Sequence, residues 1–76
     1  MFTVNGYKVV AMKRRDWDDA PVVLCDRGDV PHGRYVTWVI NEHNGAAFLG
    51  HYIEGGLEAG MASLNERTTG FVVHNG

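Results

Sequence analysis

Residues 34–67 read RYVTWVINEHNGAAFLGHYIEGGLEAGMASLNER and determine the architecture that we predict for this chain. Apolar and aromatic side chains recur along two segments, Arg34–Glu42 and Ala46–Ile53, in a pattern typical of β-strands with one buried face. Between them lies Asn44-Gly45, a pair that favours a two-residue hairpin turn. The two segments are therefore predicted to pair as an antiparallel hairpin.

A two-residue turn would also fix which residues pair across this hairpin. Trp38 is then expected opposite His51, with the aliphatic pairs on the same side of the sheet. That side is the better candidate for the core, because its aliphatic side chains can pack beneath a helix. The predicted core residues are Val36, Trp38, Ile40, Leu49, Ile53, Leu57, Met61 and Leu64.

A short helix is predicted from Leu57 to Arg67. Leu57, Met61 and Leu64 recur at i, i+4 and i+7, which places them on one side of a helix. Gly60 weakens this helix by up to about 1 kcal/mol relative to alanine. Close packing of the helix on the sheet and chance both account for a glycine at this position.

The remaining predicted strands are shorter. Tyr7–Lys13 follows Asn5-Gly6, a second favoured turn pair, and Val22–Cys25 is a short β-rich run. Phe71–His74 is interpreted either as a final strand or as a tail that docks on a neighbour. The chain is therefore predicted to form one α+β domain over residues 1–76, a four-stranded antiparallel meander with one short helix packed on one face.

Size and composition define the class of protein. The chain has 76 residues, of which 45% are hydrophobic and 21% charged, an ordinary globular composition. A domain of this length buries only about 60% of its unfolded surface, so oligomerisation is a common source of extra stability. Cys25 is the only cysteine and cannot form an internal disulfide. With no signal-like leader and no long apolar run, a cytoplasmic protein without membrane contact is expected.

No residue pattern predicts catalysis, a cofactor or a metal site. The histidines, His32, His43, His51 and His74, lack the spacings that zinc sites use. Cys25 follows an apolar run and is interpreted as a small buried hydrophobic residue rather than as a nucleophile. We therefore expect a protein that is not an enzyme and that has no catalytic residue, no metal and no cofactor.

Several short motifs occur in a characteristic order. Trp17–Val23 (WDDAPVV) precedes Tyr35–Trp38 (YVTW), and Gly50–Tyr52 (GHY) precedes the Leu57–Ala59 start of the predicted helix. In this order the motifs resemble those of a group of small uncharacterised bacterial and phage-encoded proteins. The resemblance implies one small α+β domain and a phage or mobile-element origin. It implies no activity, and the predicted helix departs from the more regular Ala-rich stretch of that group.

The predicted sheet leaves one aromatic face without a cover. Its candidate binding residues are Arg34, Tyr35, Thr37, Phe48 and Tyr52. We hypothesise a non-enzymatic protein that binds a protein partner, such as a host-defence component, through this face or through a sheet edge. Burial of the same face in a homodimer is one alternative. Stacking of a nucleotide or of single-stranded nucleic acid is another, although the net charge of −2 opposes it.

Overall fold

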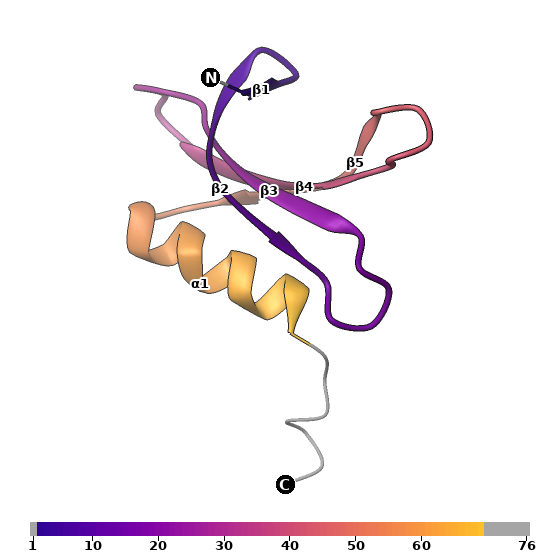
Figure 1. The fold of residues 1–76 in the computed structure, drawn as a ribbon. Helices are drawn as coiled ribbons and strands as arrows, with labels where there is room; N and C mark the ends of the chain where they lie inside the picture. Colours follow the sequence, from indigo (N-terminus) through magenta and orange to yellow (C-terminus); the bar gives the residue numbers. More distant parts are fainter. Residues whose placement is uncertain (1, 70–76) are drawn as a thin grey trace, which may run out of the picture.

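The computed structural model describes residues 2–69 and shows a curled antiparallel sheet with one helix against one face (Figure 1). The strands follow one another in chain order across the sheet, so the predicted α+β meander is confirmed. The sheet has five strands rather than four, because a short N-terminal segment adds one at the edge. The predicted element Phe71–His74 lies outside the described residues. The elements are β1 (Thr3–Val4), β2 (Tyr7–Arg14), β3 (Pro21–Asp26), β4 (Tyr35–Ile40), β5 (Ala47–Ile53) and α1 (Leu57–Thr68).

The first hairpin uses the predicted two-residue turn. Asn5 and Gly6 both have positive φ angles, 52° and 84°, as a type I′ turn requires. Val4 pairs with Tyr7 across this turn. The dipeptide therefore sets the register between β1 and β2 as its chemistry predicts.

The second Asn-Gly pair does not form such a turn. The Asn41 N–H donates to the Ala46 carbonyl at 2.8 Å, so four residues, 42–45, make up the loop. The Asn41 side chain accepts the His43 N–H at 2.9 Å, and the Asn44 side chain accepts the Ala46 N–H at 2.9 Å. Such local bonds from asparagine stabilise turns that compete with the type I′ geometry. The longer loop changes the register of the strands that it joins.

The predicted pairing of β4 with β5 is consequently wrong. Ile53 pairs with Tyr35 instead of Val36, and His51 pairs with Thr37 instead of Trp38. Trp38 instead lies opposite two residues, Leu49 and Gly50, in a β-bulge where Leu49 has a φ of 54°.

A slip of one residue exchanges the two faces of a strand. Tyr35, Thr37 and Val39 therefore lie on the helix side of β4, and Trp38 and its even-numbered neighbours lie on the other side. The core predicted beneath the helix was wrong for Val36, Trp38 and Ile40, which pack on the opposite face.

The helix-covered face holds the larger apolar cluster. Gly60, Leu64 and Thr68 are the buried residues of α1, whereas Leu57 and Met61 remain 50% and 38% exposed. The predicted core is thus confirmed for Leu64 and Ile53 and is wrong for Leu57, Met61 and the 60% exposed Leu49. A Cβ at position 60 would lie 3.1 Å from Leu24 Cδ1, so the helix does pack closely on the sheet. The cluster comprises Val22, Leu24, Tyr35, Val39, Ile53 and Leu64.

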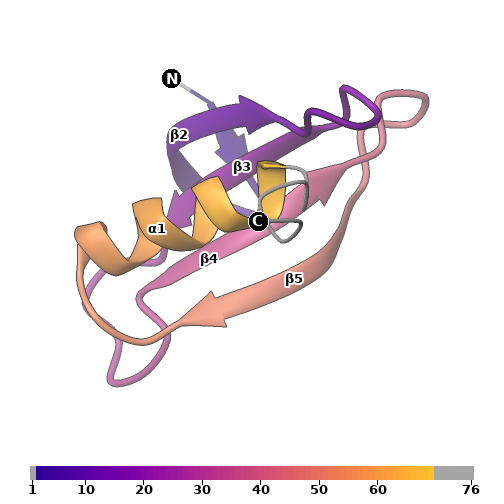
Figure 2. The ribbon, with the colours of Figure 1, turned by 90° about the horizontal axis from the view of Figure 1, so that it is seen from below.

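No helix of the described chain covers the opposite face. Side chains of the curled sheet pack against one another there. The Arg27 guanidinium lies over the Tyr52 ring at 4.7 Å and over the Tyr7 ring at 5.6 Å, so it links β2 to β5. Trp38 meets Tyr52 edge to face, with ring centroids 6.1 Å apart. A second apolar cluster of Val23, Cys25 and Val36 lies on this face, with Tyr7 and Trp38 packed against it. Seen from the helix side, α1 lies over the middle of the sheet while β5 runs clear of it at one edge (Figure 2).

Candidate functional site

Strand β5 is the most exposed long element of the described chain. Five of its seven residues are exposed. They include Phe48 at 41%, Leu49 at 60% and Tyr52 at 49% exposure. Because β5 is the last strand of the sheet, its outer backbone edge has no neighbouring strand within residues 2–69. An exposed edge with large apolar side chains is a template for pairing with another chain.

The exposed side chains of β5 flank this edge from both sides. Phe48 pairs with Val39, which packs beneath the helix, so Phe48 lies on the helix side of the sheet. Tyr52 pairs with Val36 and lies on the opposite side. A strand bound along β5 would therefore contact an aromatic ring on each side of its backbone.

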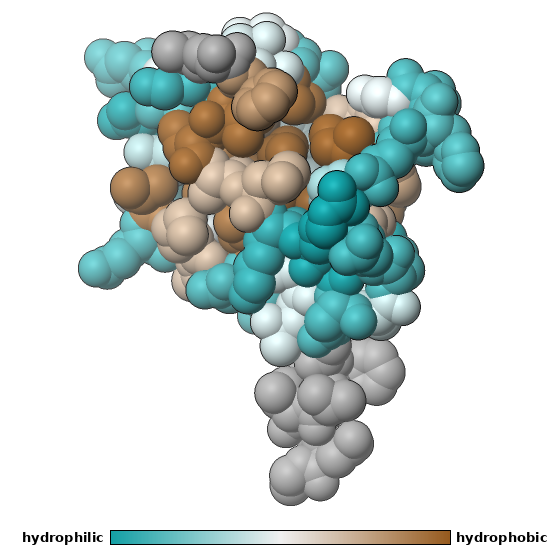
Figure 3. Space-filling model, viewed as in Figure 1, coloured by the Kyte–Doolittle hydropathy of each residue, from teal (hydrophilic) through white to brown (hydrophobic). Residues whose placement is uncertain are grey.

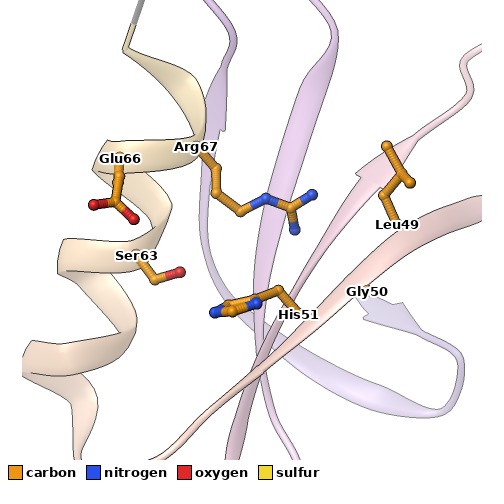
Figure 4. A pocket seen from close by; sticks show the side chains of 6 residues that line it. All are labelled: Leu49, Gly50, His51, Ser63, Glu66 and Arg67. Atoms are coloured by element: carbon orange, nitrogen blue, oxygen red, sulfur yellow. The ribbon is translucent and has the colours of Figure 1, made fainter. Parts of the chain in front are cut away.

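A cleft separates β5 from the C-terminal half of α1 (Figure 4). Its volume is about 380 Å³. Leu49, Gly50 and His51 line it from the strand, and Ser63, Glu66 and Arg67 line it from the helix. The cleft exists because α1 covers the middle of the sheet and leaves β5 projecting beyond it.

Arg67 is the principal charged group that points into this cleft. Its NH1 group donates to Thr37 Oγ1 at 2.8 Å and lies 3.3 Å from the Thr37 carbonyl oxygen. Thr37 is fully buried, so this end of the guanidinium has a fixed anchor. Burial lowers the pKa of Arg67, and the nearby charge of Arg15 lowers it further. No carboxylate of residues 2–69 forms an ion pair with Arg67.

The other polar side chains of the cleft are arranged around Arg67. The Ser63 hydroxyl and the His51 imidazole point toward each other across the cleft. Glu66 lies on the outer side of the helix and points away from the guanidinium (Figure 4). Ser63 and Arg67 are four residues apart, so they lie on the same side of α1.

The structure separates the five predicted binding residues. Tyr35 and Thr37 are 7% and 0% exposed beneath the helix, so their predicted position on an open face is wrong. The physical reason is the one-residue change of register, which turns this side of β4 toward α1. Phe48 and Tyr52 are exposed but lie on opposite sides of the sheet, and their role as contacts stays a prediction.

Arg34, the fifth predicted residue, is held by its own chain. Its Nε and NH2 groups donate to the two carboxylate oxygens of Asp26 at 3.0 and 3.2 Å. These hydrogen bonds lower the pKa of Asp26 and raise that of Arg34. Arg34 therefore closes the loop between β3 and β4, and its role as a contact residue stays a prediction.

Sequence reasoning missed Arg67, Ser63 and His51 as members of one site. A signal for two of them was available, because Gly60, Ser63, Leu64 and Arg67 follow the i, i+3, i+4, i+7 pattern of one helix side. That pattern contains one large apolar residue, Leu64, so the apolar repeat of Leu57, Met61 and Leu64 is the stronger helical signal. His51 could be placed only once the register was known.

Within residues 2–69, the other groups that could act as nucleophiles or metal ligands form no candidate site. Burial raises the pKa of the Cys25 thiol to about 11, so at neutral pH it is almost entirely protonated and weakly nucleophilic. Among residues 2–69, no group of three or more histidine, cysteine, aspartate or glutamate side chains is placed to hold a metal ion. In the same part of the chain, no helix has the length and apolar character needed to cross a membrane.

A second apolar surface lies over β1, β2 and the first half of α1 (Figure 3). The exposed large hydrophobic residues of these elements and of the adjoining N-terminus are Phe2, Val10, Met12, Leu57 and Met61. A groove of about 270 Å³ runs beside it, lined in part by Phe2, Met12 and Val23. A bulge between Val9 and Ala11 and the charges of Lys13 and Arg14 interrupt the adjacent edge of β2. Such features disfavour pairing with another strand.

No protein-family model, curated protein or solved structure matches this chain. The candidate site is therefore defined by its geometry alone.

Proposed function

We propose that this chain is a non-enzymatic binding protein whose partner docks on β5. The partner would contribute an extended polypeptide segment that adds a sixth strand to the sheet. The observation that supports this most directly is that the outer edge of β5 has no neighbouring strand within residues 2–69 and carries three large apolar side chains, Phe48, Leu49 and Tyr52, all at least 41% exposed.

Strand addition matches the physical properties of this edge. Main-chain hydrogen bonds give affinity in such complexes, and side chains on alternating sides of the strand give specificity. Here Phe48 flanks the edge on the helix side and Tyr52 flanks it on the other side. Aromatic residues dominate the energetics of protein interfaces, because each buries a large area for little lost conformational freedom.

The edge of β5 is favoured over the apolar surface above β2. The β2 edge is partly covered by β1, which pairs with Tyr7 and Lys8, and it carries a bulge and terminal charges. The β5 edge also adjoins a cleft with a half-buried cation, which a partner can recognise by its charge. A phage origin and a host-defence partner remain part of the proposal through the resemblance alone.

Base stacking has little support from this arrangement. Stacking on the predicted aromatic face requires an exposed Tyr35 side chain, but Tyr35 is only 7% exposed beneath α1. Phe48 and Tyr52 lie on different sides of the sheet, so they offer no continuous stacking surface. The net charge of −2 adds no general attraction for phosphate.

The proposal can be tested without a known partner by selecting binders from a displayed library of random linear peptides. We expect the selected peptides to protect amide hydrogens of β5 from exchange. The double variant Phe48→Ala with Leu49→Asn should weaken their binding by about tenfold or more, measured by fluorescence polarisation. Asparagine is chosen because Leu49 has a φ of 54°, a conformation that asparagine tolerates.

The matched control is the double variant Phe2→Ala with Met12→Ala on the other apolar surface, where these residues are 81% and 58% exposed. Its affinity for the same peptides should stay close to that of the wild type. Loss of binding in the control variant, with none in the β5 variant, would transfer the docking site to β2. A library that yields no binder would contradict docking of an extended segment. A stable dimer in solution, dispersed by the β5 variant, would identify a second copy as the occupant instead.

A further inference from the structure

We propose that the cleft between β5 and α1 is a carboxylate-recognition pocket, which receives an aspartate or glutamate side chain of the docked partner segment. This inference rests on the proposed function and adds the chemical class of the group that the site selects. Its central element is Arg67, which sequence reasoning had not identified as a binding residue.

Within residues 2–69, the hydrogen bonds of Arg67 occupy only the NH1 end of its guanidinium. Both of its contacts within residues 2–69 are made by NH1, to Thr37 Oγ1 and to the Thr37 carbonyl. Nε and NH2 have no acceptor in the described part of the chain. The Nε–NH2 side of a guanidinium presents two parallel N–H groups that match the two oxygens of a carboxylate. Thr37 therefore holds the group in place without using the side that binds a carboxylate in bidentate fashion.

The environment of Arg67 favours an incoming negative charge. Burial lowers its pKa, and the charge of Arg15 acts in the same direction, so the cation is partly desolvated. No carboxylate of residues 2–69 compensates its charge. A half-buried charge without a counterion is unfavourable, and an ion pair there is screened less by solvent than one on an open surface. A bound carboxylate would supply the missing counterion.

The walls of the cleft add donors at suitable places. The Ser63 hydroxyl and the His51 ring point into the space beside Arg67 (Figure 4). Gly50 lines the same space through its backbone, since a Cβ at this position would point toward Trp38 on the opposite face of the sheet. Glu66 is the one acidic side chain that the described residues contribute to the lining, and it points away from the guanidinium.

The position of the cleft couples it to strand docking. Leu49, Gly50 and His51 belong to both the cleft and the exposed edge. A strand paired with β5 would lie about 4.8 Å beyond it, and its side chains on the helix side would extend toward α1. An acidic side chain at one such position lies within reach of Arg67, whereas an alternate position would point to the side of Tyr52.

One permanent positive charge suits a carboxylate better than a phosphate. Of residues 2–69, Arg67 is the only arginine or lysine that lines the cleft. A carboxylate carries one negative charge and a phosphate about two, so phosphate sites usually gather several basic groups or main-chain donors. The chemistry of the lining therefore selects a single carboxylate.

The pocket can be tested with an isolated side-chain probe. N-acetylglutamate N-methylamide would be titrated into isotope-labelled protein at constant ionic strength, with the neutral N-acetylglutamine N-methylamide as its matched control. We expect saturable shifts at the Arg67 Nε–H and at the Gly50 and Ser63 amides with the acid and none with the amide. Arg67→Gln should abolish the shifts, because glutamine can still donate to Thr37 but carries no charge. Arg34→Gln, which removes an arginine outside the cleft, should preserve them.

A second variant guards against loss of structure in Arg67→Gln. Ser63→Ala removes one donor and favours the helix, so the fold should persist while the probe affinity falls by about threefold or more. In the selected peptides, an acidic residue should recur at one position, and its change to the amide should weaken binding by about tenfold in wild type but not in Arg67→Gln.

The outcomes separate this inference from the proposed function. Peptides that depend on Phe48 and Leu49 but show no acidic position, together with an unshifted Arg67, would overturn the pocket and leave strand docking intact. Probe shifts at Arg67 with peptides that ignore β5 would support carboxylate recognition and overturn strand docking. Equal or stronger shifts with inorganic phosphate or chloride would show general anion attraction and overturn the assignment to a carboxylate.

Discussion

The two faces of the sheet are packed by different means. On the face covered by α1, side chains interlock at close range: Leu64 is 1% exposed and Gly60 lets the helix approach Leu24. Buried polar groups there have partners, since Thr68 Oγ1 donates to the Leu64 carbonyl at 2.8 Å. On the open face, Arg27 instead links β2 to β5, because its guanidinium lies over the rings of both Tyr7 and Tyr52.

The open face is also less completely hydrogen-bonded. Arg27 Nε and Trp38 Nε1 are buried without an acceptor among residues 2–69. Each such group costs about 1–3 kcal/mol relative to a bonded one. A helix can pack closely along one face of a sheet. On the face without a helix, large planar side chains fill the space that the curled sheet encloses. Removing apolar volume should therefore lower the free energy of unfolding most under the helix, and adding volume should lower it most beneath Trp38.

The largest effect is expected from Leu64→Ala on the helix-covered face. Leu64 is 1% exposed at the centre of the larger cluster, and removing a buried leucine side chain typically costs about 2–5 kcal/mol. We expect a loss in the free energy of unfolding of about 3 kcal/mol, measured by urea denaturation. Met61→Ala is the matched control on the same helix, because Met61 is 38% exposed. Equal losses in the two variants would contradict the burial that distinguishes them.

The predictions from sequence succeeded where one local signal controlled the structure. Asn5-Gly6 forms the predicted turn, and the antiparallel α+β order follows from strands joined by short connections and one terminal helix. The same dipeptide does not form the predicted two-residue turn at Asn44-Gly45, because the side chains of Asn41 and Asn44 stabilise a longer loop. The dipeptide alone is compatible with both turns, and the neighbouring asparagine side chains favour the longer one.

The candidate site depended on that selection. With the predicted register, Tyr35 and Thr37 face solvent, and with the observed one they lie beneath α1. Leu57 and Met61 match a helical repeat as well as Leu64 does, but the helix turns its small and polar side, with Gly60, onto the sheet. Close approach of a backbone to a leucine is a tertiary property that periodicity does not report.

A smaller but still clear effect is expected from Gly50→Ala on the open face. A Cβ at this position would lie 2.7 Å from Cη2 and 2.8 Å from Cε3 of Trp38, well inside van der Waals contact. Overpacking of this kind typically costs about 1–3 kcal/mol, and we expect a loss in that range by urea denaturation, with a shifted Trp38 fluorescence maximum. Gly56→Ala is the control, because Gly56 has nothing within 4 Å of a Cβ and a φ of −93°. If Gly50→Ala were as stable as the wild type, Trp38 would not rest on β5.

The smallest of the three effects is expected from Arg27→Gln, which tests how the open face is held together. Arg27 NH1 donates to the Gly33 carbonyl at 2.8 Å, and its guanidinium contacts both tyrosine rings. Glutamine retains a donor but loses the charge and the planar group that fills the gap between the rings. Because each cation–π contact contributes about 0.5–1 kcal/mol, we expect a loss of about 1–2 kcal/mol.

The Arg27→Gln substitution should also change amide hydrogen exchange near the two tyrosines. Amide exchange should accelerate at Tyr7 in β2 and Tyr52 in β5, and remain unchanged at Leu24 beneath the helix. Arg34→Gln is the control, because Arg34 bonds Asp26 and the ring that it covers is Tyr35, not Tyr7 or Tyr52. Faster exchange at Leu24 in Arg27→Gln would mean that the two faces unfold as one unit and that the helix does not hold its side independently.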